Sequence, residues 1–167
     1  MTLIRGTGVW TPAVHAFLRH LTVAAPGIAP KVLGLAEGEE ILSYIPGRVP
    51  AITEFSTVSV AAVRSTGRLL RRLHEASRSF RLPPGVEWHR TRAAAGSRVV
   101  ICHNDVSPRN TVFHGDEAVA FIDWDFAGLT ILGGIWRMRS GSSRRSCRTQ
   151  AAACGAGPRI CPTVGHE

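Results

Sequence analysis

The sequence of 167 residues contains no apolar run that approaches the roughly 20 residues a helix needs to cross a bilayer. Its first ten residues, MTLIRGTGVW, lack the charged start, the apolar middle and the small-residue cleavage site of a signal peptide. We therefore expect a cytoplasmic protein without a membrane partner. The hydrophobic fraction of 44% is ordinary for a globular protein, and the length suffices for about one domain.

Lysine and cysteine are also scarce. Lysine occurs once against 19 arginines, a bias that we attribute to a GC-rich genome more than to chemistry. Cys102 is the only cysteine in the first 128 residues, and the other three (Cys147, Cys154 and Cys161) follow at a spacing of seven. Zinc sites use paired ligands two to four residues apart, and disulfides are rare in the cytosol. Neither a zinc site nor a disulfide framework is therefore indicated.

Acidic residues are nearly absent from the end of the chain. Residues 129–167 hold 6 Lys+Arg and 1 Asp+Glu, whereas residues 1–128 hold 14 and 11, so most of the net charge of +8 lies in the last quarter. A basic nucleic-acid-binding face across the fold is therefore not indicated, and a nucleic-acid binder acting through the end of the chain is a weaker alternative. That end is rich in Gly, Ser, Arg and Cys without periodicity. We expect a domain over 1–128 and a disordered tail over 129–167.

Three elements are predicted before residue 85. Thr11, followed by proline and by apolar residues at helical spacing, predicts a helix with Thr11 as its N-cap, ended by Pro26-Gly27. Two apolar runs in residues 31–45, separated by Ala-Glu-Gly-Glu, predict a β-hairpin. A long apolar pattern from Ile52 to Ser79 predicts a second helix with an arginine-rich solvated face.

The stretch ICHNDVSPRNTVFHGDEAVAFIDWDFAG, residues 101–128, places polar groups at the ends of short apolar runs. VVIC, TVF and AVAFID predict strands, so Asp105, Asn110 and Asp123 should converge at one edge of a hairpin. Asn110 and Asp123 carry the oxygen donors that Mg²⁺ prefers, and Asp105 could orient or deprotonate a hydroxyl. The alternative is a structural cluster in which Asp105 and Asn110 bind backbone groups of a tight loop.

The complete pattern is more specific than its parts. His103-x-Asp105-x4-Asn110, followed by a strand that ends in Asp123, resembles the catalytic loop and metal-binding aspartate of protein-kinase-like phosphotransferases. HNDVSPRN and IDWDFAG resemble most closely the aminoglycoside phosphotransferase and choline kinase branch. The resemblance covers about residues 4–128. It implies an α+β, protein-kinase-like fold with a partial N-lobe (a helix plus a hairpin) and a partial helical C-lobe that carries the catalytic hairpin.

The resemblance also implies roles for the residues of this stretch. Asp105 is the expected catalytic base and His103 the brace of its loop. Asn110 and Asp123 are the expected Mg²⁺ ligands, with Asp125 beside them.

The expected nucleotide site lies earlier in the chain. LSYIPG resembles the hinge against which adenine lies, which makes Ser43, Tyr44 and Ile45 candidate ATP-binding residues. Arg5 matches the strand cation that relatives use on the phosphates. The following helix should offer that cation a glutamate, but it has none, and His15 is a poor substitute.

The implied reaction is transfer of the ATP γ-phosphoryl group to a hydroxyl of an aminoglycoside-like or other small polar acceptor. Two parts of the family pattern are missing: the glycine-rich hairpin before Arg5 and the acceptor helices after Gly128. We therefore expect a truncated domain with impaired activity, and we hypothesise a shifted reading frame near Leu129. Some relatives are immunity proteins against peptide toxins, so the alternative is a non-catalytic, kinase-like binding or immunity protein.

Overall fold

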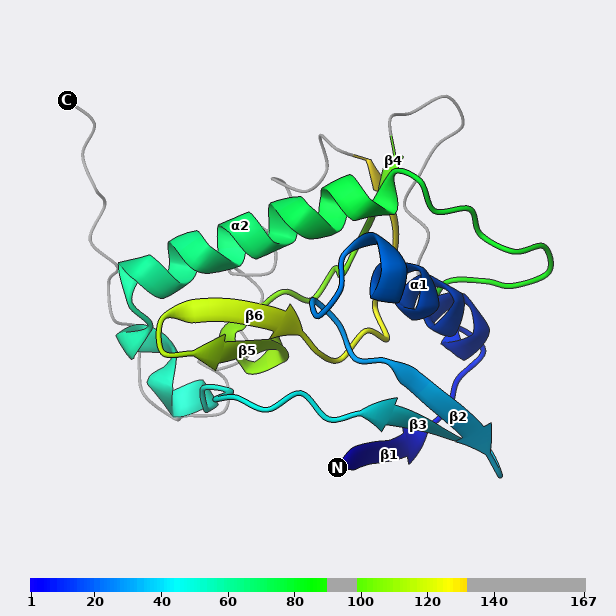
Figure 1. Ribbon diagram of the computed structural model, residues 1–167, viewed down its shortest axis with the longest axis horizontal. Helices are drawn as coiled ribbons and strands as arrows, with labels where there is room; N and C mark the ends of the chain where they lie inside the picture. The colour runs from blue at the N-terminus through cyan, green and yellow to red at the C-terminus, as the bar shows by residue number, and fades with distance from the viewer. Residues whose placement is uncertain (90–98, 132–167) are drawn as a thin grey trace, which may run out of the picture. The chain divides into compact units, whose positions relative to one another are not determined.

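The structure is a computed structural model that describes residues 1–89 and 99–131. The N-terminal part is a three-stranded antiparallel sheet packed with one helix (Figure 1). Its strands are β1 (Thr2–Gly6), β2 (Val32–Ala36) and β3 (Glu39–Ser43), in the order β1-β3-β2. The helix α1 (Thr11–Ala24) lies between β1 and β2 in the chain. The predicted helix and hairpin are thus confirmed, and β1 adds an edge strand.

Helix α1 forms because its apolar residues recur on one face. Five of them are buried in the core: Ala13, Val14, Phe17, Leu18 and Leu21. The predicted N-cap is wrong by one residue. Trp10 takes the cap position without a side-chain hydrogen bond, because the Thr11 hydroxyl instead accepts from the Gly8 N–H at 2.9 Å and closes the preceding turn.

The β2–β3 hairpin fixes the face on which Glu40 lies. Glu37 and Gly38 both have positive φ angles, 52° and 80°, as the two central residues of a tight hairpin turn often do. Along β3, Glu40 and Leu42 are buried and point to the same side, since side chains alternate along a strand. In the antiparallel register with β1, Arg5 is opposite Glu40. The sheet therefore brings these two charges together.

The single helix predicted from Ile52 to Ser79 is wrong in its first third. The structure has a 3₁₀ helix, η1 (Ile52–Thr57), and then α2 (Val60–Ser77). The break occurs because Ser59 is extended and its hydroxyl accepts from the Ala62 N–H at 3.0 Å, so that Ser59 caps α2. Figure 1 shows α2 running beside the hairpin that follows. The arginines of α2 are exposed, as predicted.

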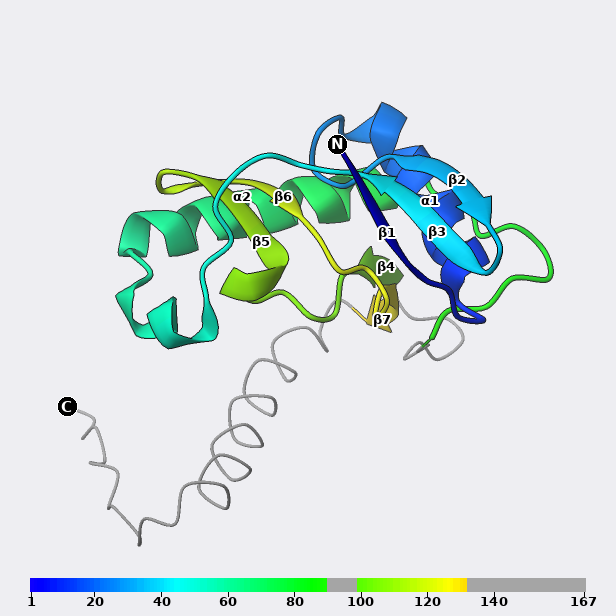
Figure 2. The same cartoon turned by 90° about the horizontal axis from the view of Figure 1, so that it is seen from below.

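The remaining elements surround the motif stretch. They are β4 (Val99–Cys102), the short 3₁₀ helix η2 (Pro108–Asn110), β5 (Thr111–His114), β6 (Glu117–Phe121) and β7 (Gly128–Ile131). The predicted strands VVIC and TVF are confirmed, whereas the third predicted strand ends at Phe121 and not at Asp123. Strand β5 pairs with β6 as an antiparallel hairpin. Strand β4 does not join this hairpin but pairs with β7, and the two strands lie side by side in Figure 2. Residues 129–131, which we had assigned to the tail, thus belong to a strand, while 132–167 lie outside the described residues.

An aromatic cluster joins α1 to the motif stretch. The ring of Phe17 lies 5.1 Å from Phe80, 6.0 Å from Trp88 and 5.9 Å from Trp124, measured between centroids, at angles near edge-to-face. Trp124 is 1% exposed and donates its indole N–H to the Phe121 carbonyl at 2.9 Å.

In the described part of the chain, none of the helices combines the length and the apolar character needed to cross a membrane.

Candidate active site

The loop after β4 brings Asp105 and Asn110 into direct contact. The Asn110 amide donates to the Asp105 carboxylate at 2.8 Å and to the Asp105 main-chain carbonyl at 2.9 Å. Asn110 is buried, whereas the Asp105 side chain is 32% exposed and also contacts the Arg109 guanidinium at 3.5 Å. The loop therefore orients a solvent-accessible carboxylate by a buried amide. The same amide bonds a backbone group, so the structural role that we left open is present beside the chemical one.

His103 lies directly under this loop. Its Nε2 is 2.8 Å from the Ile122 carbonyl, and its Nδ1 accepts from the Asp105 N–H at 3.4 Å, so Nε2 carries the proton. Burial lowers the pKa of His103, although the hydrogen bond to Ile122 and the charges of Asp105 and Asp123 favour protonation. A neutral His103 thus connects the loop to the Ile122 carbonyl after β6. Its role as a brace of the loop, which the resemblance implies, stays a prediction.

Asp123 follows β6 at the point where the backbone turns sharply. Its φ is 63°, a conformation that aspartate and asparagine tolerate better than most residues. The preceding N–H, that of Ile122, donates to the Asn110 carbonyl at 3.0 Å. The predicted convergence of Asp105, Asn110 and Asp123 at one end of the hairpin is therefore present, tied together by backbone and side-chain hydrogen bonds.

Arg5 is the cation of the site, and it contacts three carboxylates. Its Nη1 is 3.1 Å from Asp123, its Nη2 contacts Asp125, and its Nε contacts Glu40. Burial alone would lower the pKa of Arg5, but the hydrogen bond and charge of Glu40 and the charge of Asp125 outweigh it and raise that pKa. Arg5 therefore stays charged and joins the N-terminal sheet to the motif stretch.

Sequence reasoning missed Glu40. Its side chain is 2% exposed and binds Arg5 through Oε1 and the His15 Nε2 through Oε2, at 2.5 Å. Burial by itself would raise the pKa of Glu40, but the hydrogen bonds from His15 and Arg5 and the charge of Arg5 lower it. The expected helix glutamate is thus replaced by a strand glutamate. The alternation of β3 could have revealed it, since Glu40 lies on the same face as Leu42.

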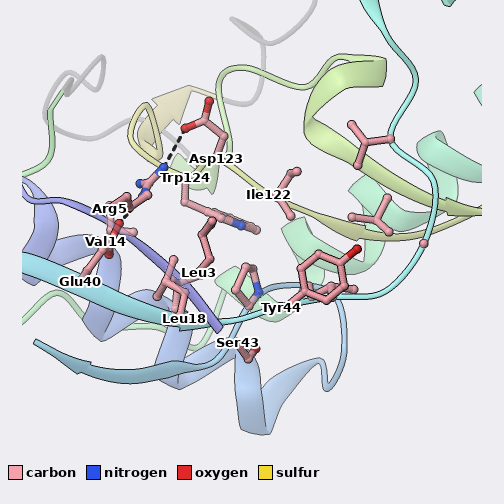
Figure 3. Close-up of a pocket in the computed structure, with 16 residues that line it drawn as sticks. Leu3, Arg5, Val14, Leu18, Glu40, Ser43, Tyr44, Ile122, Asp123 and Trp124 are labelled. Carbon is pink, nitrogen blue, oxygen red and sulfur yellow. Dashed lines mark hydrogen bonds and ion pairs between the residues drawn. The ribbon is translucent and has the colours of Figure 1, made fainter. Parts of the chain in front are cut away.

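A cavity of about 180 Å³ extends from Arg5 towards the predicted hinge (Figure 3). Its polar end is formed by Arg5, Glu40 and Asp123, and Figure 3 shows the Arg5–Asp123 contact there. The rest of the lining is mainly apolar and includes the three hinge candidates Ser43, Tyr44 and Ile45, together with Leu3, Val14, Leu18, Leu42, Val112, Ile122 and Trp124. All candidate nucleotide-binding residues therefore lie along one cavity.

The chain is similar to known proteins in part of its sequence and in its fold. Residues 85–133 match the model of a family described as "Phosphotransferase enzyme family". The chain is 35% identical over 129 residues to the trifolitoxin immunity protein of Rhizobium leguminosarum bv. trifolii. The aligned region covers 74% of this chain and 48% of that protein. The fold matches the solved complex of gentamicin with APH(2″)-IIa at a TM-score of 0.54 and 12% identity, over 78% of this chain and 60% of the other. Residues 85–133 of this chain are thus similar to the phosphotransferase enzyme family.

The structural match also confirms the α+β, protein-kinase-like fold of the chain. The chain spans about half the length of the curated relative that it matches. The family model covers the loop with Asp105, Asn110 and Asp123, whereas Arg5 and the hinge lie before it.

The donor set suits the magnesium that phosphotransferases use better than a transition metal. Mg²⁺ is bound by one or two protein oxygens together with water and phosphates. Asn110 offers an amide oxygen and Asp123 a carboxylate oxygen. Asn110 uses its amide nitrogen on Asp105, so its Oδ1 is the atom suited to a cation. Among the described residues, no three His, Cys, Asp or Glu side chains gather as a metal site. Asn110 and Asp123 therefore offer oxygen donors of the kind that suits Mg²⁺.

Cys102 is a buried side chain beside the candidate site. It is 5% exposed at the end of β4, and burial raises the pKa of its thiol to about 11. The thiol therefore favours its protonated form at neutral pH and packs as a small buried side chain.

Proposed function

We propose that this chain binds Mg·ATP and transfers the γ-phosphoryl group to a hydroxyl of a small polar acceptor. One observation carries the proposal. Asp105, Asn110 and Asp123 are held together at one end of a hairpin, and Arg5 connects Asp123 to a cavity lined by the hinge candidates. A base, two cation ligands and a phosphate-binding cation are the parts that phosphoryl transfer needs.

The nucleotide would lie in the cavity with adenine against Ser43, Tyr44 and Ile45 and its phosphates towards Arg5 and Asp123. Apolar walls suit the base, and the guanidinium suits the phosphates because it offers several N–H donors in a fixed plane. Asn110 and Asp123 would hold Mg²⁺, which neutralises charge on the phosphates when it is bound. The chain thus separates a base-binding wall from a charged end.

Asp105 would then serve the acceptor. As the acceptor oxygen forms its bond to the γ-phosphorus, the bond from that phosphorus to the β–γ bridging oxygen breaks, and ADP leaves. The acceptor proton passes to the Asp105 carboxylate, which Asn110 keeps in one orientation. An acceptor such as an aminoglycoside has hydroxyls of this kind, and the solved relative was crystallised with gentamicin. The acceptor class stays part of the proposal.

Titration of the full chain with ATP, with and without Mg²⁺, tests the nucleotide site. We expect Mg²⁺-dependent binding in the wild type that is lost in Asp123→Asn, a variant that keeps the side-chain shape and tolerates the positive φ. Glu117→Gln, which removes an exposed charge on β6, is the matched control and should bind like the wild type. A folded wild type that binds no ATP in either condition would contradict the proposal.

A second function is favoured by one comparison. The curated relative at 35% identity is an immunity protein, and immunity can be achieved by binding alone. In this alternative the chain captures a ligand in its cavity without transferring a phosphoryl group. The two functions differ in their dependence on Asp105: capture should survive Asp105→Asn, whereas transfer should not.

A further inference from the structure

Glu40 is a buried carboxylate that connects Arg5 to α1. It lies on β3, directly opposite Arg5 on β1, and its second oxygen is 2.5 Å from the Nε2 of His15 on α1. The side chains of Glu40 and His15 are only 2% and 6% exposed. Three elements thus contribute one residue each to a continuous hydrogen-bonded chain, His15–Glu40–Arg5.

Burying this hydrogen-bonded chain costs free energy, so a functional reason for it is worth seeking. A buried carboxylate loses its hydration, and buried ion pairs can often be replaced by apolar residues at no loss of stability. The cavity that Glu40 lines is also lined by Val14, Leu18 and Leu42, so an apolar residue at position 40 would suit its wall. The polar chain therefore points to a role for the orientation of Arg5 rather than to stability alone.

The contacts of Arg5 show what that role would be. The Nε of Arg5 is held by Glu40 from behind, and the two terminal nitrogens point to Asp123 and Asp125 at the opposite end. A guanidinium bound only through its terminal nitrogens can still change its tilt, because its stem has several free torsions. Contact at Nε fixes its plane, and each terminal nitrogen keeps a second N–H for another acceptor.

We propose that Glu40 and His15 are positioning residues that hold the Arg5 guanidinium for the phosphate groups of a nucleotide. The inference rests on the proposed nucleotide site and adds two residues to it. His15 acts through Glu40 and thereby couples α1 to Arg5. The helix glutamate that family resemblance led us to expect is replaced by this two-residue connection.

The test compares ATP with adenosine, both in the presence of Mg²⁺, by calorimetry on the full chain. If Glu40 positions Arg5, Glu40→Gln weakens ATP binding by about tenfold or more, the size of a lost charge-assisted hydrogen bond, and leaves adenosine binding unchanged. His15→Gln weakens ATP binding by about threefold to tenfold, because glutamine keeps a donor but not its position. Glu39→Gln, an exposed neighbour on β3, is the control and changes neither affinity.

A double-mutant cycle separates positioning from a general loss of structure. In an Arg5→Gln background, His15→Gln should cause no further loss of ATP affinity, because its effect passes through Arg5. An equal loss in both backgrounds, or an equal loss for ATP and adenosine, would overturn the inference. The cycle needs only His15 and Arg5 variants, so it decides the matter even if Glu40→Gln does not fold. A folded wild type that binds adenosine but not ATP overturns the proposed function itself, before any variant is compared.

Discussion

The candidate site combines two regions that are assembled over very different distances along the chain. In the loop after β4, Asp105 and Asn110 are five positions apart and bind each other. In the cluster around Arg5, the three carboxylates lie 35, 118 and 120 positions away from the arginine. The loop can therefore form its contacts from a short stretch, whereas the Arg5 cluster exists only when the sheet and the motif stretch pack together.

This difference predicts that the loop and the Arg5 cluster serve separate steps, turnover and nucleotide binding. The loop holds the carboxylate that would take the acceptor proton, and its geometry depends on nearby hydrogen bonds. The Arg5 cluster would hold the nucleotide phosphates, and its geometry depends on the whole fold. A change in the loop should thus affect turnover at constant binding, while a change in packing should affect both.

The largest expected effect is that of Asp105→Asn. Without the carboxylate, the acceptor proton has no base, so turnover should fall by a factor of about 10² to 10⁴. The ATP affinity should stay within a factor of about two, because the Arg5 cluster is unchanged. ADP release with a panel of hydroxyl acceptors and calorimetry with ATP measure the two quantities. Equal losses of both would show that loop and cluster are not separable.

Trp124→Ala should affect the two regions together. Trp124 lies between Asp123 and Asp125, and its ring is 4.6 Å from His103 and 5.9 Å from Phe17. Truncating this buried ring should lower the free energy of unfolding by about 3 to 5 kcal/mol, measured by urea denaturation. Trp10→Ala is the control: Trp10 is only half-buried, so its loss should be clearly smaller. Similar losses in both variants would contradict a shared core between loop and cluster.

The contrast in distance also explains what the sequence could predict. The loop and its two flanking runs were predicted correctly, because spacing within a short stretch decides both the strand ends and the contacts of Asp105 and Asn110. Strand β4 was predicted but its partner β7 was not, since pairing between residues 99–102 and 128–131 is non-local. The burial of Glu40 could have been read from the alternation along β3, but its contact with Arg5 could not, since only the register of β1 against β3 brings the two residues together.

Local competition caused the other errors. The apolar pattern from Ile52 onward is compatible with one helix, but Ser59 caps a new helix and Glu54 reaches back to the Ala51 N–H at 2.8 Å. These side-chain hydrogen bonds outweigh the periodicity at that point. Thr11 was likewise expected to cap α1, although its hydroxyl binds the turn before the helix.

Gly47→Ala tests the connection between the hinge and the catalytic hairpin. Gly47 has a φ of 147°, and a Cβ there would lie 2.4 Å from the Val112 side chain. Arg48 and Phe113 exchange backbone hydrogen bonds of 2.9 and 2.8 Å next to it, so the chain cannot easily move away. We expect a loss of about 1 to 3 kcal/mol in stability together with weaker ATP binding.

Gly67→Ala provides the matched control for Gly47. Gly67 lies in α2, and a Cβ there would meet nothing within 4 Å. Alanine in a helix interior is favoured over glycine by about 0.5 to 1 kcal/mol, so this variant should be more stable than the wild type. Thermal denaturation should give opposite shifts for the two variants, and equal shifts would show that neither the positive φ nor the close approach at Gly47 constrains the chain.

The smallest expected effect is the pH dependence that His103 contributes. Burial lowers the pKa of His103, so the folded state stays neutral where the unfolded state takes up a proton. Its contribution to stability is fully present above about pH 6.5 and is lost as the pH falls through the lower folded pKa, at no more than about 1.4 kcal/mol per pH unit. Urea denaturation between pH 7.5 and 5.5 should therefore show a shallower decline in His103→Gln than in the wild type. A slope in His103→Gln equal to that of the wild type would mean that the loop is not held by a neutral imidazole.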